Sequence, residues 1–279
     1  MEKARPVVNF VREIISIYQS KRASRSAAEF AYFLVLSIFP VLICIVAILA
    51  HFDLSIHGIL DDSWTVDIAD TVMGYLDHLV DVPSWQIIAM SLTVIAMSGS
   101  AAFRAMAKIM SEIQGESRYK GILGLVISFV FAMLLLLTVY FSVLMITSGA
   151  WLMEQIEYAT RIYGLAAFWQ RIRFVILSAV VVVVVHLIYL FTAPKDLRIR
   201  RLPGAIIATV ALVIGSMIFS VFTAASVRYP VIYGSLASFV LLMIWCYLCG
   251  NIIIVGNVFN HVLHTMRGDK DARSDGGEG

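Results

Sequence analysis

The sequence predicts an all-α fold: a polytopic membrane protein with a bundle of six transmembrane helices and amphipathic interfacial helices. Hydrophobic residues make up 60% of the chain and charged residues 14%, and the mean hydropathy is +0.88. Soluble domains contain only about 45–50% apolar residues. Six stretches are apolar over about 20 residues, the helix length that crosses a ~30 Å hydrocarbon layer. Lys and Arg are concentrated in alternate loops.

Residues 1–25 are predicted to form a cytoplasmic amphipathic segment. Between Pro6 and Gln19 apolar residues recur at helical spacing, while Arg5, Arg12 and Glu13 fall elsewhere. Such a helix lies along a membrane surface with its apolar side toward the lipid. The apolar face consists of Val7, Val8, Val11, Ile14, Ile15 and Tyr18.

The six-helix transmembrane domain is predicted over residues 26–266, and Ser26 to Glu29 has the form of a capping box that opens the first span. Glu29 has two interpretations: an interfacial helix cap, which is the simpler one, or a carboxylate at the mouth of a pathway. The pathway interpretation rests on Ser37 and Pro40, which share a face with Glu29. Pro40 donates no backbone hydrogen bond, so the carbonyl of Leu36 is free for a neighbour, a water or an ion.

An acidic loop at about residues 51–84 follows the first span. It contains no Lys or Arg but seven aspartates, which places it outside the cell by the positive-inside rule. Helical spacing between Ala69 and Val80 predicts an amphipathic helix within the loop. The aspartates form a solvated face or, alternatively, concentrate cations near an entrance. His57 and His78 show no tight spacing with them, so no metal site is predicted.

The second span, about Trp85 to Phe103, is the most polar and is predicted to lie inside the bundle, with Ser98 among its serines. Its helix is predicted to continue beyond the membrane until Gly115 ends it. The third span runs from Ile122 to Thr147.

The fourth span, Phe174 to Ala193, follows an outer aromatic belt and consists almost entirely of Val, Ile and Leu. His186 is its only strongly polar residue. An ionisable residue inside a span often marks a functional site. A neutral histidine bonded to a neighbouring helix is the competing interpretation.

The fifth span begins at Pro203 and repeats small residues at helical spacing, which is typical of a close helix contact. These residues are Gly204, Ala208, Ala211 and Gly215. Their most natural partner is the small and polar stripe of the sixth helix.

The sixth helix is predicted from Tyr233 to His264, with an apolar core from Leu236 to Phe259. One side is bulky and suits lipid, whereas the other is small and polar and suits the bundle interior. Asn251 lies off this polar stripe without an explanation in the sequence. The stripe contains Ser235, Ser238, Cys246, Cys249, Gly250, Gly256, Asn257, Asn260 and His264.

Cys246 and Cys249 lie one turn apart on this stripe, and Cys44 lies in the first span. Small packing residues are the preferred interpretation of the pair, and a redox or metal pair is the alternative. Three cysteines leave one unpaired in any disulfide scheme, so no disulfide framework is expected. The sequence predicts no cofactor.

The distribution of Lys and Arg predicts a bacterial cytoplasmic membrane protein with both termini in the cytoplasm. The tail, residues 267–279, is charged and rich in glycine, so it is expected to be disordered. With this topology 17 basic residues lie inside and 4 outside. The outside set is Arg161, Arg171, Arg173 and Arg228, and the inside set is Lys3, Arg5, Arg12, Lys21, Arg22, Arg25, Arg104, Lys108, Arg118, Lys120, Lys195, Arg198, Arg200, Arg201, Arg267, Lys270 and Arg273.

Four stretches resemble the YihY/BrkB family of bacterial cytoplasmic membrane proteins: Ala28 to Pro40, Ser98 to Arg104, Pro203 to Ala205, and Tyr233 to Ala237 leading into Gly256 to Asn260. The resemblance covers nearly the whole chain and implies six transmembrane helices. Members of the family have been labelled as virulence factors and, in some cases, as ribonuclease BN. The resemblance implies a glutamate directly after the glycine in many members, whereas this chain has Asn257 after Gly256. A proton- or cation-carrying role of that glutamate in relatives is therefore not expected to carry over to this chain.

The sequence argues against a ribonuclease or another enzyme. Nuclease chemistry needs a water-exposed acid–base or metal cluster beside a basic groove, but the internal loops contain few acids and the aspartates are predicted outside. No nucleic-acid partner is expected.

Two function classes remain. One is passage of an ion, small solute or lipid through the bundle, and the other is a non-transporting membrane scaffold for envelope assembly or surface integrity. Membrane lipids are the expected partners, and the oligomeric state does not follow from the sequence. Transport is preferred because Pro40, His186 and Asn257 are costly choices for simple packing. The candidate pathway residues are Glu29, Ser37, Pro40, Ser98, His186, Asn257 and Asn260, and the candidate packing residues are Gly204, Ala208, Gly215, Ser235 and Ser238.

Overall fold

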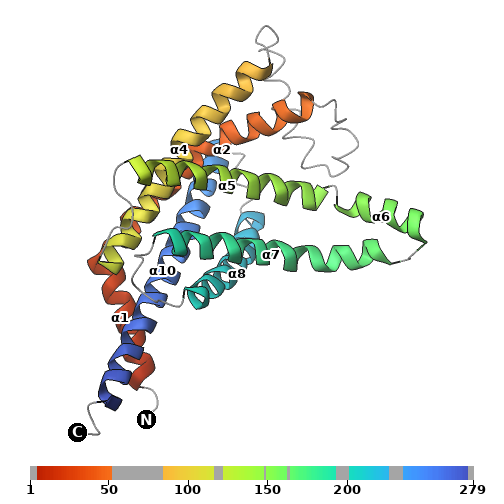
Figure 1. The fold of residues 1–279 in the computed structure, drawn as a ribbon. Helices are drawn as coiled ribbons and strands as arrows, with labels where there is room; N and C mark the ends of the chain where they lie inside the picture. The colour runs from red at the N-terminus through yellow and green to blue at the C-terminus, as the bar shows by residue number, and fades with distance from the viewer. Residues whose placement is uncertain are drawn as a thin grey trace. The chain divides into compact units, whose positions relative to one another are not determined.

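A computed structural model describes residues 5–51, 84–115, 122–147, 149–161, 164–192, 201–225 and 235–275. Within these ranges every regular element is a helix, which confirms the predicted all-α fold. The predicted helix in the acidic loop lies outside the described residues. The helices are α1 (Arg5–Ser20), α2 (Ala23–His51), α4 (Ser84–Gln114), α5 (Ile122–Thr147), α6 (Gly149–Thr160), α7 (Leu165–Thr192), α8 (Leu202–Ala225) and α10 (Ser235–Asp275) (Figure 1).

Four of the described helices are long and apolar enough to cross a membrane: Ile88–Gln114 in α4, Arg171–Thr192 in α7, Leu202–Thr223 in α8 and Phe239–Met266 in α10. The chain is therefore a multi-pass helical membrane protein. α2 and α5 contain the first and third predicted spans, and part of their side chains lie outside the described residues. Six spans stay a prediction.

Several helix ends differ from the sequence-based expectation. Arg22 adopts a left-handed conformation (φ 52°), which lets α2 begin directly at Ala23. The predicted capping box is therefore wrong, because Ser26 lies inside the helix instead of at its cap. The end of α4 is confirmed: Gly115 has φ 85°, and its N–H donates to the Ser111 carbonyl at 2.9 Å. A left-handed residue of this kind ends a helix most easily when it is glycine.

Two other helices are longer than expected. α7 begins at Leu165, directly after Gly164 with φ 98°, and so includes the basic residues that precede the fourth span. α10 continues to Asp275, beyond residue 267, where the sequence predicts the start of a disordered tail.

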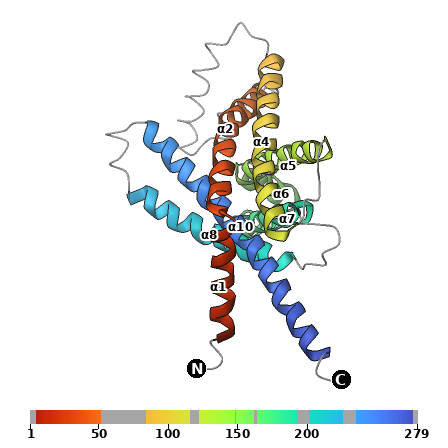
Figure 2. The ribbon, with the colours of Figure 1, turned by 90° about the vertical axis from the view of Figure 1, so that its left-hand side faces the viewer.

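The described chain divides into two units. Unit 1 comprises Met1–Val35, Ala101–Val126 and Val181–Gly279. In this unit α8 lies along α10, and α1 packs against α10 as well (Figures 1 and 2). One face of α4 is apolar and forms much of the core of unit 1. The opposite face carries Arg104, Lys108 and Glu112, which are exposed. These core residues are Phe103, Met106, Ile109, Met110 and Ile113.

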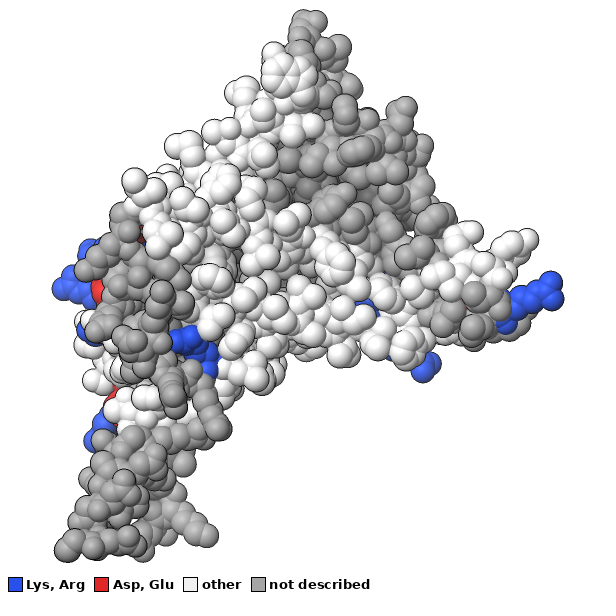
Figure 3. Space-filling model, viewed as in Figure 1, with Lys and Arg blue, Asp and Glu red and all other residues white. Residues whose placement is uncertain are grey.

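Unit 2 comprises Leu36–Ser100 and Ile127–Val180. In it α4 approaches α5 closely, since a Cβ added to Gly99 would lie 2.9 Å from the Cβ of Ala132. Large apolar side chains such as Leu137, Phe174 and Val175 are exposed. On the face shown in Figure 3, the described surface in this region is mostly uncharged, and Lys and Arg stand out toward the α6 end. Such a surface suits lipid tails.

Candidate functional site

The start of α8 and the middle of α10 touch backbone to backbone in unit 1. A Cβ added to Gly204 would lie less than 3.0 Å from the Gly256 carbonyl oxygen and from the Asn260 side chain. A Cβ added to Gly256 would lie 2.9 Å from both the Gly204 carbonyl oxygen and the Ala208 Cβ. Only glycine fits at either position without movement of a neighbour, so the two helices meet through small residues.

Asn260 joins α10 to the N-terminus of α8 through both ends of its amide. Its Oδ1 accepts a hydrogen bond from the Gly204 N–H at 2.8 Å, and its Nδ2 donates to the Arg201 carbonyl at 2.9 Å. The first N–H groups of a helix lack partners within the helix. Asn260, which is 1% exposed, provides an acceptor from another helix for one of these N–H groups.

Tyr189 brings α7 to the same place. Its hydroxyl donates to the Ile253 carbonyl of α10 at 2.6 Å, and the side chain is fully buried. A Cβ on Gly256 would lie 2.5 Å from this hydroxyl, so Gly256 makes room for Tyr189 as well as for α8. One turn later, the Thr192 hydroxyl donates to the Ile188 carbonyl at 2.7 Å and lies 3.2 Å from the Met110 sulfur of α4.

Gln114, the last residue of α4, pairs with Asn257 of α10. The Gln114 Nε2 donates to the Asn257 Oδ1 at 3.0 Å, and the two side chains are 8% and 1% exposed. Gln114 Oε1 and Asn257 Nδ2 are buried and have no hydrogen-bond partner among the described residues. Turning both amides over exchanges these roles but still leaves one donor and one acceptor unpaired.

The unpaired groups of Gln114 and Asn257 distinguish this pair from Asn260. A buried polar group without a partner costs about 1–3 kcal/mol, so buried amides are normally satisfied. The Gln114–Asn257 pair offers one acceptor and one donor, which suits water or a neutral polar group that both donates and accepts. In Asn260, by contrast, both the amide oxygen and the amide nitrogen have a hydrogen-bond partner.

Apart from Asn260, the other candidate pathway residues lie on other helices of unit 1 or in unit 2. Glu29 is exposed on α2, and His186 is half-buried on α7 with its Nδ1 unpartnered among the described residues. Ser37, Pro40 and Ser98 belong to unit 2. The Ser98 hydroxyl donates to the Val94 carbonyl of its own helix at 2.7 Å, so this donor needs no partner from a pathway.

Of the candidate packing residues, Gly204 and Ala208 both lie against Gly256. Gly215 is less crowded, since a Cβ there would lie 3.5 Å from Ile252 Cδ1, an ordinary contact. The side chains of Ser235 and Ser238 lie outside the described residues.

Sequence reasoning missed Tyr189 and Gln114. The signal for Tyr189 is a hydroxyl inside an otherwise apolar span, because a buried tyrosine O–H usually finds a partner. Gln114 carries a weaker signal, since its place directly before Gly115 is typical of a solvated helix end.

Asn251, which the polar stripe does not explain, attaches α1 to α10. The Tyr18 hydroxyl donates to the Asn251 Oδ1, and the Asn251 Nδ2 donates to the Tyr247 carbonyl at 2.8 Å. The hydroxyls of Ser24 and Tyr247 lie 2.9 Å apart. Partial burial raises the pKa of the Tyr18 phenol above its usual value, so it remains a donor at neutral pH.

We expect Tyr18→Phe to loosen α1, because it leaves the partly buried Asn251 Oδ1 without its donor at a cost of about 1–2 kcal/mol. The measurement is the rate of limited proteolysis within α1 of the purified protein, which should rise. Tyr32→Phe is the control, since Tyr32 is 56% exposed. Equal proteolysis of both variants and the unmodified chain would show that this bond does not hold α1.

Comparison of the sequence with known proteins shows which family the chain belongs to. A family model described as virulence factor BrkB matches residues 14–277. The chain belongs to the BrkB family. This confirms the resemblance in the sequence, and the matched range includes every residue of the Gln114–Asn257 and Asn260 contacts.

One relative of this BrkB-family chain is the ribonuclease-like protein YfkH of Bacillus subtilis (strain 168). The two are 24% identical over 269 residues, which cover 93% of this chain and 97% of YfkH. No solved structure matches the chain.

Proposed function

We propose that this BrkB-family protein moves an ion, small solute or lipid through its helix bundle, and that the Gln114–Asn257 pair contacts the moving species or the water around it. The observation that carries the proposal is the donor and the acceptor of this pair that are buried between α4 and α10 and have no partner in the described part of the chain. A residue selected only for packing has little reason to hold such groups, and Asn260 shows how the same helix satisfies an amide when it serves packing.

The proposed setting is the bacterial cytoplasmic membrane, with both termini in the cytoplasm. The supporting observation is the segregation of 17 basic residues to one side and 4 to the other. In this orientation Gln114 lies on the cytoplasmic side, at the end of the helix that contains the second span, because the basic residues Arg104, Lys108 and Arg118 surround it in sequence.

We propose no enzymatic activity, although YfkH is named ribonuclease-like. Gln114 and Asn257 are neutral amides, so neither acts as a general base at neutral pH. The cytoplasmic loops also contain few carboxylates, whereas nuclease chemistry needs acid–base or metal-bound groups.

Thiol labelling tests whether water reaches the pair. In membranes carrying a Cys-free chain with Gln114→Cys or Asn257→Cys, we expect labelling by a small membrane-impermeant thiosulfonate. Two positions on α10 serve as controls, Val258→Cys and Ile244→Cys. Val258 is fully buried, and Ile244 is 43% exposed on the predicted lipid-facing side. Both should stay unlabelled.

The second candidate function is a non-transporting scaffold for envelope assembly or surface integrity. It is favoured by the tight contact between Gly204 and Gly256, which fixes α8 against α10. If Gln114→Cys and Asn257→Cys stay as silent as Val258→Cys while His264→Cys reacts, no aqueous pathway reaches the pair. The scaffold function is then preferred.

A further inference from the structure

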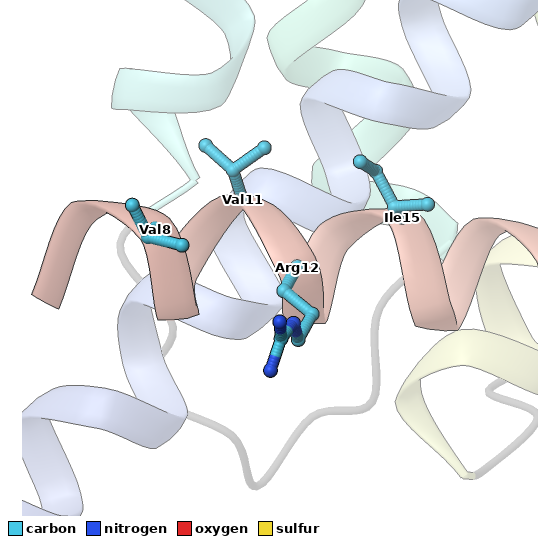
Figure 4. Close-up of a pocket in the computed structure, with 4 residues that line it drawn as sticks. All are labelled: Val8, Val11, Arg12 and Ile15. Carbon is cyan, nitrogen blue, oxygen red and sulfur yellow. The ribbon is translucent and has the colours of Figure 1, made fainter. Parts of the chain in front are cut away.

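The outer face of α1 is apolar and uncovered by the described residues. Val8, Val11 and Ile15 are 56%, 47% and 50% exposed, which is unusual for three aliphatic side chains on successive turns of one helix. Together with Arg12 they line an open groove of about 410 Å³. Val11 and Ile15 point to the same side of α1, and Arg12 extends from its flank (Figure 4).

The inner face of α1 is fixed to a membrane-spanning helix. The rings of Phe10 and Phe259 meet edge to face with centroids 5.3 Å apart, and Tyr18 bonds to Asn251. Both α10 partners belong to the candidate span Phe239–Met266. α1 is therefore held against a helix that is long and apolar enough to cross the membrane.

We propose that this groove binds an anionic phospholipid of the surrounding bilayer, with an acyl chain on Val8, Val11 and Ile15 and the phosphate on Arg12. An arginine guanidinium forms paired hydrogen bonds with phosphate oxygens, and its aliphatic stem lies along apolar surface. The proposal stands independently of the proposed transport function, because the groove and the Gln114–Asn257 pair share no residue.

The charges around the groove favour an anion. Glu13 is the only acidic residue of α1 and is half-buried, whereas Arg12 is exposed. Lys21, Arg22 and Arg25 follow α1 directly and are all exposed. Basic residues near an anionic leaflet strengthen attachment to it, and an apolar face beside them lies among the acyl chains.

Lipid retention by the purified full-length protein tests the charge. We expect native mass spectrometry to detect more retained phosphatidylglycerol than phosphatidylcholine, and Arg12→Gln to lower phosphatidylglycerol affinity about fivefold. Lys108→Gln removes the same charge from an exposed site on α4 and should leave retention unchanged. Equal retention by the two variants would overturn the proposal.

Spin labels test the apolar contact. In vesicles containing phosphatidylglycerol, a nitroxide at Val11→Cys should relax more with oxygen than with a water-soluble nickel chelate. Asn9→Cys is the matched control, because Asn9 is exposed on another side of α1 and should show the reverse preference. If the nickel chelate dominates at Val11 as well, the face lies in water and a soluble partner is the better occupant.

Discussion

Gly204→Ala lowers the stability of the protein by about 3 kcal/mol or more. The added methyl group would lie less than 3.0 Å from the Gly256 carbonyl oxygen and the Asn260 side chain. Backbone atoms of α10 cannot yield locally, so the helices must separate. Overpacking alone costs about 1–3 kcal/mol, and separation also strains the Asn260 hydrogen bonds. We expect the thermal midpoint in detergent to fall by about 10 °C.

Gly215→Ala is the matched control on the same helix. A Cβ at Gly215 makes only an ordinary contact with Ile252 Cδ1 at 3.5 Å. Alanine is favoured over glycine inside a helix by about 1 kcal/mol, so this variant should be as stable as the unmodified chain or slightly more stable. If the thermal midpoint of Gly204→Ala equals that of Gly215→Ala, the close approach of α8 to α10 is not a structural requirement.

Asn260→Leu should be nearly as damaging, at about 3 kcal/mol. Leucine has a similar size but forms neither hydrogen bond, so the buried Gly204 N–H loses its partner and the Arg201 carbonyl loses a donor. Each lost bond to a buried group costs about 1–3 kcal/mol. The measurement is the thermal midpoint in detergent, compared with Thr265→Val.

Thr265 lies on the same helix, is exposed and donates only to the His261 carbonyl of its own turn. Thr265→Val should therefore be nearly neutral. An Asn260→Leu midpoint within about 1 °C of that control would contradict the role of Asn260 as a partner of the α8 N-terminus.

The sequence predicted the helical membrane fold because its signals are local: apolar length, charge placement and the left-handed Gly115 are readable without a partner. Asn260 stood out because a fixed rotation per residue places it on the small and polar side of α10. That rotation names a face but not its neighbour. Whether the amide of Asn257 finds a hydrogen-bond partner depends on where α4 ends, because Gln114 is the last residue of that helix.

Asn251 is a second residue whose partner the helical pattern does not reveal. It lies off the polar stripe because its partner is α1, outside the bundle interior for which the stripe was defined. The start of α2 was misplaced for a related reason: a left-handed arginine at position 22 is uncommon, and the Ser26 to Glu29 pattern is a stronger local signal.

The central claim is that Gln114 and Asn257 are retained for a polar ligand or for water, and not for stability. The most direct measurement is the thermal midpoint of the double variant Gln114→Met/Asn257→Leu, which keeps the shapes and removes all four polar groups. Replacing both partners of an incompletely satisfied pair by apolar groups is nearly neutral or stabilising. We predict a midpoint equal to or above that of the unmodified protein, whereas a fall as large as that of Asn260→Leu would contradict the claim.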